Sequence, residues 1–231
     1  MTLSGSTLRR RLPGALGLGL AVALLGTAPA GLAQETAPQR LQVAALSPDD
    51  VAAVTRIERY LNDIKTMRAR FVQVSSNGSY AEGVVFVDRP GHMRFDYDPP
   101  SPVLMIANGL TLLYYDKELK EATFLPLWET PLWFLIRDEV RLDENVEVVG
   151  IEQALGTLRI TLRDPDTPDA GAVTLVFSDG PLILRKWELT DPQGIRTQVS
   201  LVNPVYGEEM DPKLFKYGDL EIHNRPQNRD R

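Results

Sequence analysis

Arg89 is the residue whose type and surroundings most suggest a specific task. It lies in the turn 88–91, where a proline presets φ and the following glycine tolerates a positive φ. An apolar strand, 84–87, precedes the turn, and a strand that places Met93 and Phe95 on one face follows it. The pattern predicts a β-hairpin with Arg89 at its rim, beside large apolar side chains. On this pattern alone, a solvated surface arginine is the simplest interpretation.

Residue types that would indicate catalysis or metal binding are sparse. The chain has no cysteine, which excludes disulfides, a thiol nucleophile and thiolate metal sites. Its two histidines, His92 and His223, have no acidic neighbours at ligand spacing, so no metal site is predicted. The sequence lacks a Gly-x-Ser-x-Gly elbow, a Gly-Lys-Ser/Thr phosphate loop and a dinucleotide fingerprint. The chain is expected to be no enzyme and to use no cofactor. The sequence alone does not exclude a glycosidase-type pair among its scattered carboxylates.

The first 33 residues predict a secretory signal peptide. Three arginines at 9–11 precede an apolar run at 15–25, and small residues offer cleavage after Ala30 or, as we prefer, after Ala33. A retained membrane anchor fits less well because the apolar run is short. Cleavage after Ala33 leaves 22 basic and 31 acidic side chains, a net charge of −9, which does not fit a nucleic-acid-binding surface. The chain is therefore expected to be exported and soluble.

The mature chain is predicted to begin with an amphipathic helix. Ser47 is a favoured N-cap, and a proline follows at the first helical position. The residues before it form a flexible leader, and the last eight form a polar tail. The predicted organisation is a signal peptide (1–33), a leader (34–46), one domain (47–223) and a tail (224–231). Apolar residues recur at helical spacing as far as Lys65: Val51, Val54, Ile57, Leu61 and Ile64.

After this helix the apolar period changes to two, and short turns separate the segments. The pattern indicates a mainly β fold with a large antiparallel sheet curled toward a barrel. Strands 103–107 and 110–115 are apolar on both faces, so we expect a core or cavity on one side of them and a helix on the other. The predicted strands are 71–75, 80–87, 93–97, 103–107, 110–115, 121–125, 146–153, 155–163, 173–177, 182–190 and 195–203.

A very apolar segment, 125–137, interrupts the strands. Thr130 as N-cap and Pro131 at the first helical position predict a short helix over 132–136. Because this helix is apolar nearly all the way round, it is either a core helix or a cover over an apolar partner. The bulky residues of the segment include Trp128, Leu132, Trp133, Phe134 and Ile136.

A set of motifs, in order over residues 47–222, resembles the periplasmic outer-membrane lipoprotein carrier family, LolA. The matching residues are Arg70-Phe71-Val72-Gln73, Glu82-Gly83, Arg89-Pro90, Arg94-Phe95, Asn108-Gly109, Leu112, Tyr115, Thr130-Pro131, Asp211-Pro212 and Phe215.

This resemblance implies an incomplete, strongly curved antiparallel β-barrel covered by a helical lid, which carries lipoproteins from the inner to the outer membrane. It implies that Arg89 bonds to the lid and keeps an empty cavity shut. The implied partners are acylated lipoproteins and an inner-membrane lipoprotein-releasing ABC transporter, and whether an outer-membrane lipoprotein receptor is a further partner stays open. The protein is expected to be a monomer and to bind no nucleic acid. The candidate cavity residues are Val85, Met93, Phe95, Leu112 and Tyr114, and the candidate lid residues are Ile57, Leu61, Trp128, Leu132, Trp133, Phe134 and Ile136.

The physical chemistry of the residues agrees with such a carrier. A buried methylene is worth about 0.8 kcal/mol, so a lipid chain needs on the order of 10 kcal/mol of apolar contact to leave a membrane. Arg89 offers five donors, which suit the uncapped carbonyls at a helix end. Two alternatives remain: a periplasmic sensor that binds a membrane signalling protein, and a periplasmic hydrolase.

Overall fold

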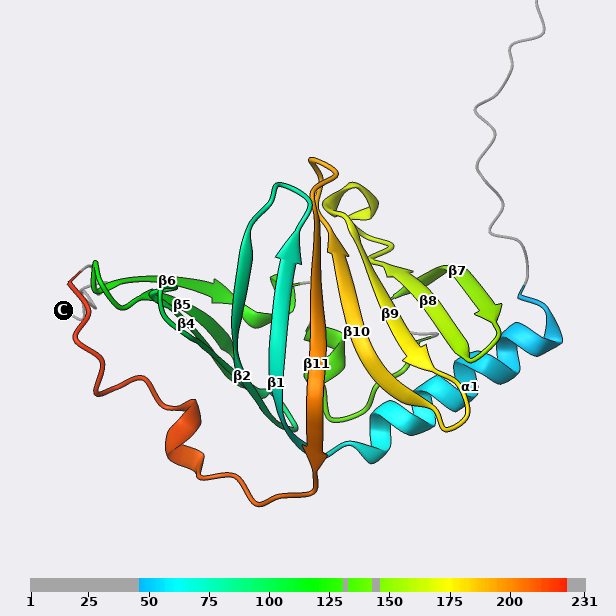
Figure 1. Cartoon of the computed structure of the whole chain (residues 1–231), viewed down its shortest axis with the longest axis horizontal. Helices are drawn as coiled ribbons and strands as arrows, with labels where there is room; N and C mark the ends of the chain where they lie inside the picture. The colour runs from blue at the N-terminus through cyan, green and yellow to red at the C-terminus, as the bar shows by residue number, and fades with distance from the viewer. Residues whose placement is uncertain (1–45, 131–132, 143–145, 224–231) are drawn as a thin grey trace, which may run out of the picture. The chain divides into compact units, whose positions relative to one another are not determined.

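The computed structural model describes residues 46–130, 133–142 and 146–223. The predicted signal peptide, nearly all of the predicted leader and the predicted tail lie outside these residues. Within them, one α-helix accompanies an antiparallel sheet of eleven strands (Figure 1). The elements are α1 (Pro48–Asp63), β1 (Thr66–Ser75), β2 (Tyr80–Asp88), β3 (His92–Tyr97), β4 (Val103–Asn108), β5 (Thr111–Asp116), β6 (Glu121–Pro126), β7 (Glu147–Ala154), β8 (Thr157–Arg163), β9 (Ala172–Ser178), β10 (Ile183–Thr190) and β11 (Arg196–Tyr206), with 3₁₀ turns η1 (Leu127–Glu129), η2 (Trp133–Ile136), η3 (Pro168–Ala170) and η4 (Pro212–Phe215).

Helix α1 begins where the sequence predicts. The Ser47 hydroxyl accepts from the Asp50 amide at 3.2 Å and the Asp50 carboxylate accepts from the Ser47 amide at 3.3 Å, forming a capping box. The apolar stripe is narrower than predicted: Ile57 is fully buried, but Val51 is 52% exposed. Val51 lies roughly 120° around the helix from Ile57, so it cannot face the same neighbour.

The sheet order is β6-β5-β4-β3-β2-β1-β11-β10-β9-β8-β7. Two meanders, β1–β6 and β7–β11, are joined where β1 pairs with β11. Strands β6 and β7 follow one another in the chain, yet they form the two opposite edges of the sheet, so the sheet is not closed into a barrel (Figure 1). The predicted fold class, a mainly β, incomplete antiparallel barrel, is confirmed. The connection from β6 to β7 must pass from one edge of the sheet to the other.

One face of the sheet, here called the inner face, packs against α1 and the β6–β7 connection. Its buried cluster joins Ile57 of α1, Ile136 of the connection, and Phe71, Phe95 and Trp187 of the sheet. In Figure 1, α1 runs beside the β7–β10 half of the sheet, and the Tyr60 ring meets the Phe177 ring edge-on at a centroid distance of 5.7 Å. Two segments distant in sequence therefore cover one apolar sheet face.

The opposite, outer face of β3–β6 carries a second buried cluster. Strands β4 and β5 are covered on both faces, as predicted, but the second cover is not a helix. It is the C-terminal segment 207–223, which contains only the 3₁₀ turn η4. Asp211 caps this turn by accepting from the Lys213 amide at 2.9 Å. The buried residues of this cluster are Leu104, Ile106, Leu113, Tyr115, Ala122, Met210 and Phe215.

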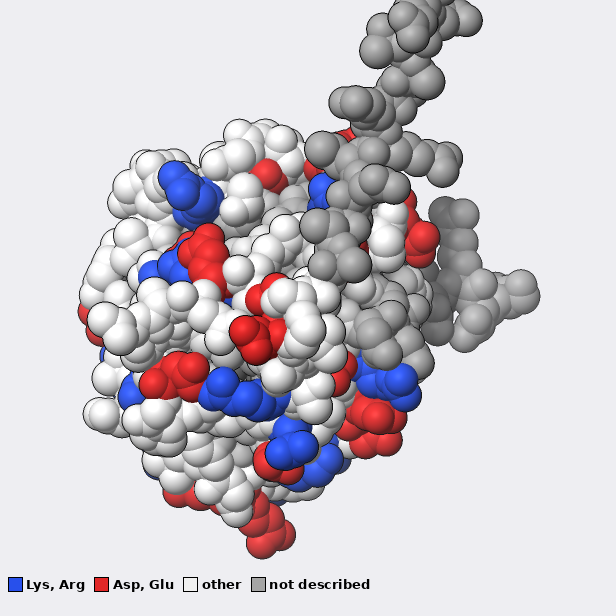
Figure 2. All heavy atoms as spheres, turned by 90° about the vertical axis from the view of Figure 1, so that its right-hand side faces the viewer, with Lys and Arg blue, Asp and Glu red and all other residues white. Residues whose placement is uncertain are grey.

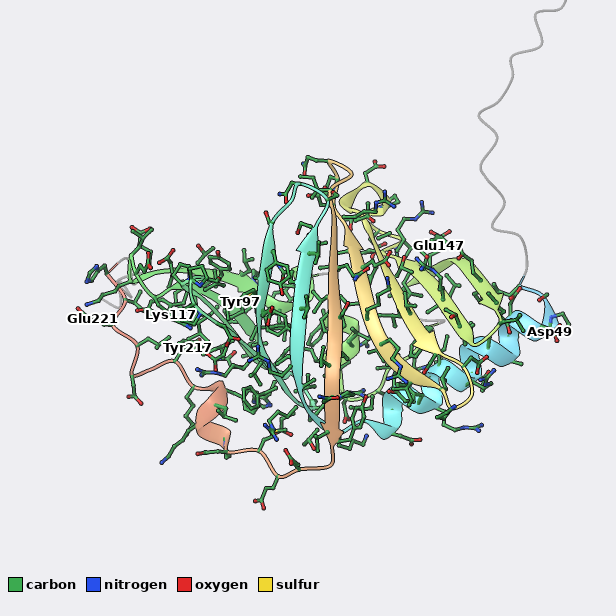
Figure 3. All side chains as sticks on the ribbon, viewed as in Figure 1. Asp49, Tyr97, Lys117, Glu147, Tyr217 and Glu221 are labelled. Atoms are coloured by element: carbon green, nitrogen blue, oxygen red, sulfur yellow. The ribbon has the colours of Figure 1, made fainter. Side chains whose placement is uncertain are left out.

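Polar contacts fasten the C-terminal segment to the outer face. Arg94 pairs with Asp96 at 2.6 Å and donates from Nη1 to the Leu214 carbonyl at 2.9 Å. The Tyr115 hydroxyl donates to the Glu221 carbonyl at 2.7 Å. Figure 3 shows Glu221 at the same end of the sheet as Lys117. Arg94 and Asp96 thus lie opposite Met93 and Phe95, as the strand pattern predicts.

The short helix predicted over 132–136 appears over Trp133–Ile136, but as a 3₁₀ helix and not as an α-helix. The described part of the segment forms two 3₁₀ turns, η1 and η2, and Thr130 follows η1 as its C-cap. The Thr130 hydroxyl donates to the Leu127 carbonyl at 2.7 Å. Five residues can form almost no i→i−4 bonds, so tighter 3₁₀ turns replace an α-helix here. Pro131 and Leu132 lie outside the described residues.

Charged side chains of both signs are mixed on the surface of the β7–β8 side. Figure 2 shows Lys and Arg beside Asp and Glu over the described part of this face. Arg163 pairs with Glu147 at 2.7 Å, and Arg159 lies 3.4 Å from Glu152. Because the charges alternate, the net negative charge is not gathered into one region of this face.

Candidate functional site

Arg89 is buried at the rim of the inner face. It follows directly after β2, and its amide donates to the Lys65 carbonyl at 2.8 Å. Gly91 has a positive φ of 79°, and its amide donates to the Ile136 carbonyl at 2.6 Å. The turn therefore contacts the chain just after α1 and the end of η2 through its backbone alone. The Arg89 side chain is only 9% exposed, so the solvated-arginine interpretation is wrong.

The five N–H donors of Arg89 have five acceptors. Nε donates to the Arg137 carbonyl at 2.8 Å, and Nη2 donates to the Asp138 carbonyl at 3.2 Å and to Asn62 Oδ1 at 3.4 Å. Nη1 donates to the carbonyls of Leu61 and, at 3.1 Å, Ile64. The last carbonyls of a helix have no partner within it, and the C-terminal end favours a cation. Arg89 therefore holds the end of α1 and residues 137–138 at once.

The charge of Arg89 is kept despite its burial. Burial lowers the pKa of the guanidinium, and the nearby Asp138 carboxylate raises it in opposition. Arginine starts far above neutral pH, so it remains a cation with five donors. A buried cation is unfavourable unless its hydrogen bonds are complete. Its five acceptors are thus what allows Arg89 to occupy this position.

Two polar side chains of α1, missed in the sequence, bind the second covering segment. The Asn62 side-chain amide donates to the Val140 carbonyl at 2.9 Å and accepts from the Val140 amide at 2.8 Å. The Glu58 carboxylate accepts from the Leu142 amide at 2.7 Å. We call α1 together with residues 133–142 the cover. Because Arg89, Asn62 and Glu58 all join its two parts, the cover is held together as well as held to the sheet.

Replacing Asn62 with alanine is expected to loosen the attachment of residues 137–142 to α1 at Val140. The change leaves the buried N–H and C=O of Val140 without partners, which typically costs about 1–3 kcal/mol. Amide hydrogen exchange at Val140 should accelerate by a corresponding factor. Asn77→Ala is the matched control, because Asn77 accepts a single bond from Ser79 in an exposed turn. Equal exchange at Val140 in wild type and Asn62→Ala would contradict the assignment.

The predicted cavity residues share the inner face, but they do not surround one large void. Val85, Met93, Phe95 and Leu112 are buried in the inner cluster. Tyr114 is two residues from Leu112 in β5 and therefore lies on the same face of the sheet. It is nevertheless 42% exposed and lies outside that cluster. The inner face is therefore largely filled by its own side chains and by the cover.

A small cavity of about 50 Å³ remains beneath Arg89. An engineered apolar cavity that binds benzene measures about 150 Å³, so this space cannot hold a lipid chain. A chain could enter only if the cover moved. Of the predicted residues, Met93, Leu61 and Ile136 line this cavity. The full lining is Leu61, Ile64, Met67, Val87, Arg89, Met93, Leu135, Ile136, Leu184 and Trp187.

The predicted lid residues divide between buried and exposed positions. Ile57 and Leu61 are buried on the sheet-facing side of α1, and Ile136 is buried in η2. Trp133 packs partly buried against the same cluster. Trp128 is 61% exposed and is not part of this cluster. The side chains of Leu132 and Phe134 lie outside what the structure describes.

The half-buried Tyr60 joins α1 to the sheet, where it meets the 38% exposed Tyr206 of β11. The Tyr60 hydroxyl accepts from the Leu184 amide at 3.0 Å and lies 3.1 Å from the Tyr206 hydroxyl. Burial, together with this contact, raises the pKa of Tyr206. On the inner face, burial raises the pKa of Tyr97 to about 12, and its hydroxyl donates to Gln73 at 2.8 Å. Because their pKa values are raised, the hydroxyls of Tyr97 and Tyr206 stay protonated at neutral pH and act as hydrogen-bonding groups.

The described residues offer neither a metal site nor a membrane-spanning helix. They do not gather three His, Cys, Asp or Glu side chains into a potential metal site. No helix in the same ranges has both the length and the apolar character to cross a bilayer.

Comparison with known proteins gives one family. A family model described as "Outer membrane lipoprotein carrier protein LolA" matches residues 62–218. An outer-membrane lipoprotein carrier protein of Coxiella burnetii is 35% identical over 178 residues, 74% of this chain and 77% of that protein. One from Azotobacter vinelandii is 29% identical over 186 residues, 75% of this chain and 88% of that protein. The crystal structure of a LolA superfamily protein from Nitrosomonas europaea has a TM-score of 0.43 and 9% identity, over 71% of this chain and 97% of that one.

Proposed function

Because this chain belongs to the LolA family of outer-membrane lipoprotein carrier proteins, we propose that it carries lipoproteins from the inner to the outer membrane by binding their acyl chains. It is a carrier rather than an enzyme and uses no cofactor. The predicted signal peptide would deliver it to the periplasm, where it works as a monomer. The acyl chains would lie against the inner face, in contact with Val85, Met93, Phe95 and Leu112.

One observation carries this proposal: a buried arginine closes an apolar interior. All five donors of Arg89 go to the cover, at the end of α1 and at residues 137–138. Apolar residues of similar volume would close a permanent core at no greater cost, since a buried charge must first be desolvated. Hydrogen bonds to backbone carbonyls, in contrast, can be broken and remade. The arrangement therefore supports a cover that opens and closes.

Opening would exchange one set of contacts for another. The closed form leaves about 50 Å³ beneath Arg89, so a chain can bind only in an open form. Opening breaks the bonds from Arg89 and exposes Ile57 and Leu61 of α1. A buried methylene is worth about 0.8 kcal/mol, so an acyl chain can offset this loss. The ligand would thus shift an equilibrium between two forms of the cover.

The energy for loading would come from a membrane partner. The sequence has no nucleotide-binding motif, so the chain cannot couple loading to hydrolysis by itself. An inner-membrane lipoprotein-releasing ABC transporter fits this requirement. At the outer membrane, either a receptor or the lipid surface would take the cargo.

Transfer between membranes tests the proposal directly. Inner-membrane vesicles that contain the transporter and a labelled lipoprotein are mixed with the mature protein and ATP. We expect the lipoprotein to appear in solution bound to one molecule of carrier, and then to move to outer-membrane vesicles. Recovery of a membrane signalling protein without any acylated cargo would instead identify a sensor, and turnover of the lipid would identify a hydrolase. Either outcome would overturn the proposal.

A further inference from the structure

Trp187 has a buried donor that the closed structure leaves unused. The side chain is 4% exposed and lines the cavity beneath Arg89, but its Nε1–H has no acceptor among the described residues. Buried indole N–H groups normally find a partner. On the premise of the proposed carrier function, we propose that Trp187 donates to a carbonyl oxygen of the cargo. This oxygen belongs to the ester or amide that attaches an acyl chain to the lipoprotein.

The polarity of the cavity favours a ligand with one acceptor on an apolar body. Of the ten lining residues, only Trp187 and Arg89 bring polar side-chain groups, and both are donors. The Arg89 donors are all taken by the cover, which leaves the indole N–H. A water molecule needs two to four polar partners, and the side chains around it offer no acceptor stronger than the thioether sulfurs of Met67 and Met93. An acyl carbonyl has a lone acceptor oxygen followed by methylenes, which matches these walls.

The position of the cavity fits the polar end of an acyl chain. It lies at the rim where β1 and β3 begin and β2 ends, since Met67, Met93 and Val87 line it. The C-terminal end of α1 closes the same rim through Leu61. A chain that enters here would run its methyl end along the inner face. Its carbonyl would enter last and remain near Trp187.

A bulge in β10 directs Trp187 into this cavity. The pairing of β10 with β9 shifts register between Leu184 and Lys186, which places an extra residue, Arg185, in β10. Without the bulge, residues three apart in a strand would point to opposite faces. Leu184 and Trp187 instead both line the cavity. The local irregularity therefore aims the indole at the place where a ligand would bind.

A contact within the protein is the competing explanation. The rings of Trp187 and Phe95 lie in an edge-to-face arrangement with centroids 6.3 Å apart, so the N–H could be directed at the Phe95 ring face. Such a contact would not distinguish between ligands. A ligand with a carbonyl and one without it separate the two explanations.

The test compares two lipopeptides with the mature protein. One carries ester-linked palmitoyl chains, and the other carries the same chains in ether linkage, without carbonyls. We expect wild type to bind the ester form roughly fivefold more tightly, the worth of one hydrogen bond. Trp187→Phe should bind both forms equally, near the affinity of wild type for the ether form. Tyr80→Phe is the control, because it removes a donor from an aromatic residue at the far end of β2, and it should keep the preference.

The outcomes separate this inference from the carrier proposal. If wild type binds neither lipopeptide, the carrier function is wrong. If wild type binds both equally, or if Trp187→Phe keeps the ester preference, only the role of Trp187 is wrong. Indole N–H signals of the wild-type protein give a second measurement that needs no variant. The chain has three tryptophans, and the Trp187 signal should shift downfield with the ester form and not with the ether form.

Discussion

Arg89→Leu is expected to leave the sheet folded and to loosen the cover. The substitution removes all five hydrogen bonds to α1 and to residues 137–138. Bonds that involve a charged group contribute about 1.5–3 kcal/mol each, but the variant no longer buries a charge, so much of that sum is recovered. We expect the closed form to lose on the order of 2–4 kcal/mol relative to the open form. The strand pairs keep their backbone bonds, so the fold itself should persist.

Hydrogen exchange measures this change where it occurs. A loss of that size predicts faster amide exchange near the C-terminal end of α1, by roughly 30- to 1,000-fold. Loaded carrier should also release lipoprotein less readily, since the bonds that favour the closed, empty form are gone. Arg94→Leu is the matched control, because Arg94 lies on the opposite face and bonds to the Leu214 carbonyl. It should speed exchange in the C-terminal segment and leave α1 unchanged. Transfer at the wild-type rate by Arg89→Leu would contradict the proposed role.

The cover has a second attachment, which should limit how far it opens. Tyr60 bonds to the backbone of Leu184, and Arg56 forms an ion pair with Asp179. Both contacts lie on the N-terminal side of Arg89's contacts with α1, and Arg89→Leu leaves them in place. We therefore expect the C-terminal end of α1 and residues 137–142 to separate from the sheet first. That is the same rim at which the cavity beneath Arg89 lies.

The strands could be predicted because their signals are local. Alternation of apolar and polar residues, with Asn-Gly and Pro-Gly turns between them, needs no knowledge of distant segments. The hairpin formed by β2 and β3 appears as expected, with Met93 and Phe95 on the inner face and Arg94 on the outer face. The hydrogen-bond partners of Arg89, in contrast, have no local signal in the sequence. Only the family resemblance pointed to them, because a turn residue and a helix end 25 residues apart leave no local pattern.

The parts that could not be predicted depend on contacts between distant segments. The C-terminal segment lacks regular periodicity, and it is ordered by the apolar outer face of β4 and β5. In the sequence, Asn62 and Glu58 are ordinary polar residues of an exposed helix face. Their role is visible only in the fold, which places the backbone of Val140 beside Asn62 and that of Leu142 beside Glu58. The bulge in β10 places Trp187 on the same face as Leu184, which the regular two-residue alternation of a strand does not predict. Each case is a long-range or irregular feature that a single sequence does not encode locally.

Gly83→Ala is expected to destabilise the fold severely, for a reason that lies in the packing of three strands. Gly83 of β2 pairs with Phe71 of β1 on one side and Tyr97 of β3 on the other. The Phe71 ring lies over the glycine and contacts the rings of Phe95 and Tyr97 at centroid distances of 5.2 and 5.0 Å. A Cβ at Gly83 would lie 2.8 Å from Phe71 Cε1 and would overlap the Asp96 carbonyl oxygen. Neither the fully buried ring nor the backbone can yield without breaking the pairing.

Chemical denaturation of the variant measures the cost, which we expect to be about 3 kcal/mol or more in the free energy of unfolding. Gly150→Ala is the control: it also lies in a strand, but its added Cβ would be 3.9 Å from the nearest atom, Thr161 Cβ, and should change stability little. A Gly83→Ala protein as stable as Gly150→Ala would contradict the packing argument. Because Gly83 acts on the sheet and not on the cover, the folded fraction should still close through Arg89. In that fraction, the amides of α1 should be protected from exchange as in wild type, whereas in Arg89→Leu this protection should be lost. Such a difference would show that the glycine forms the inner face and the arginine closes it.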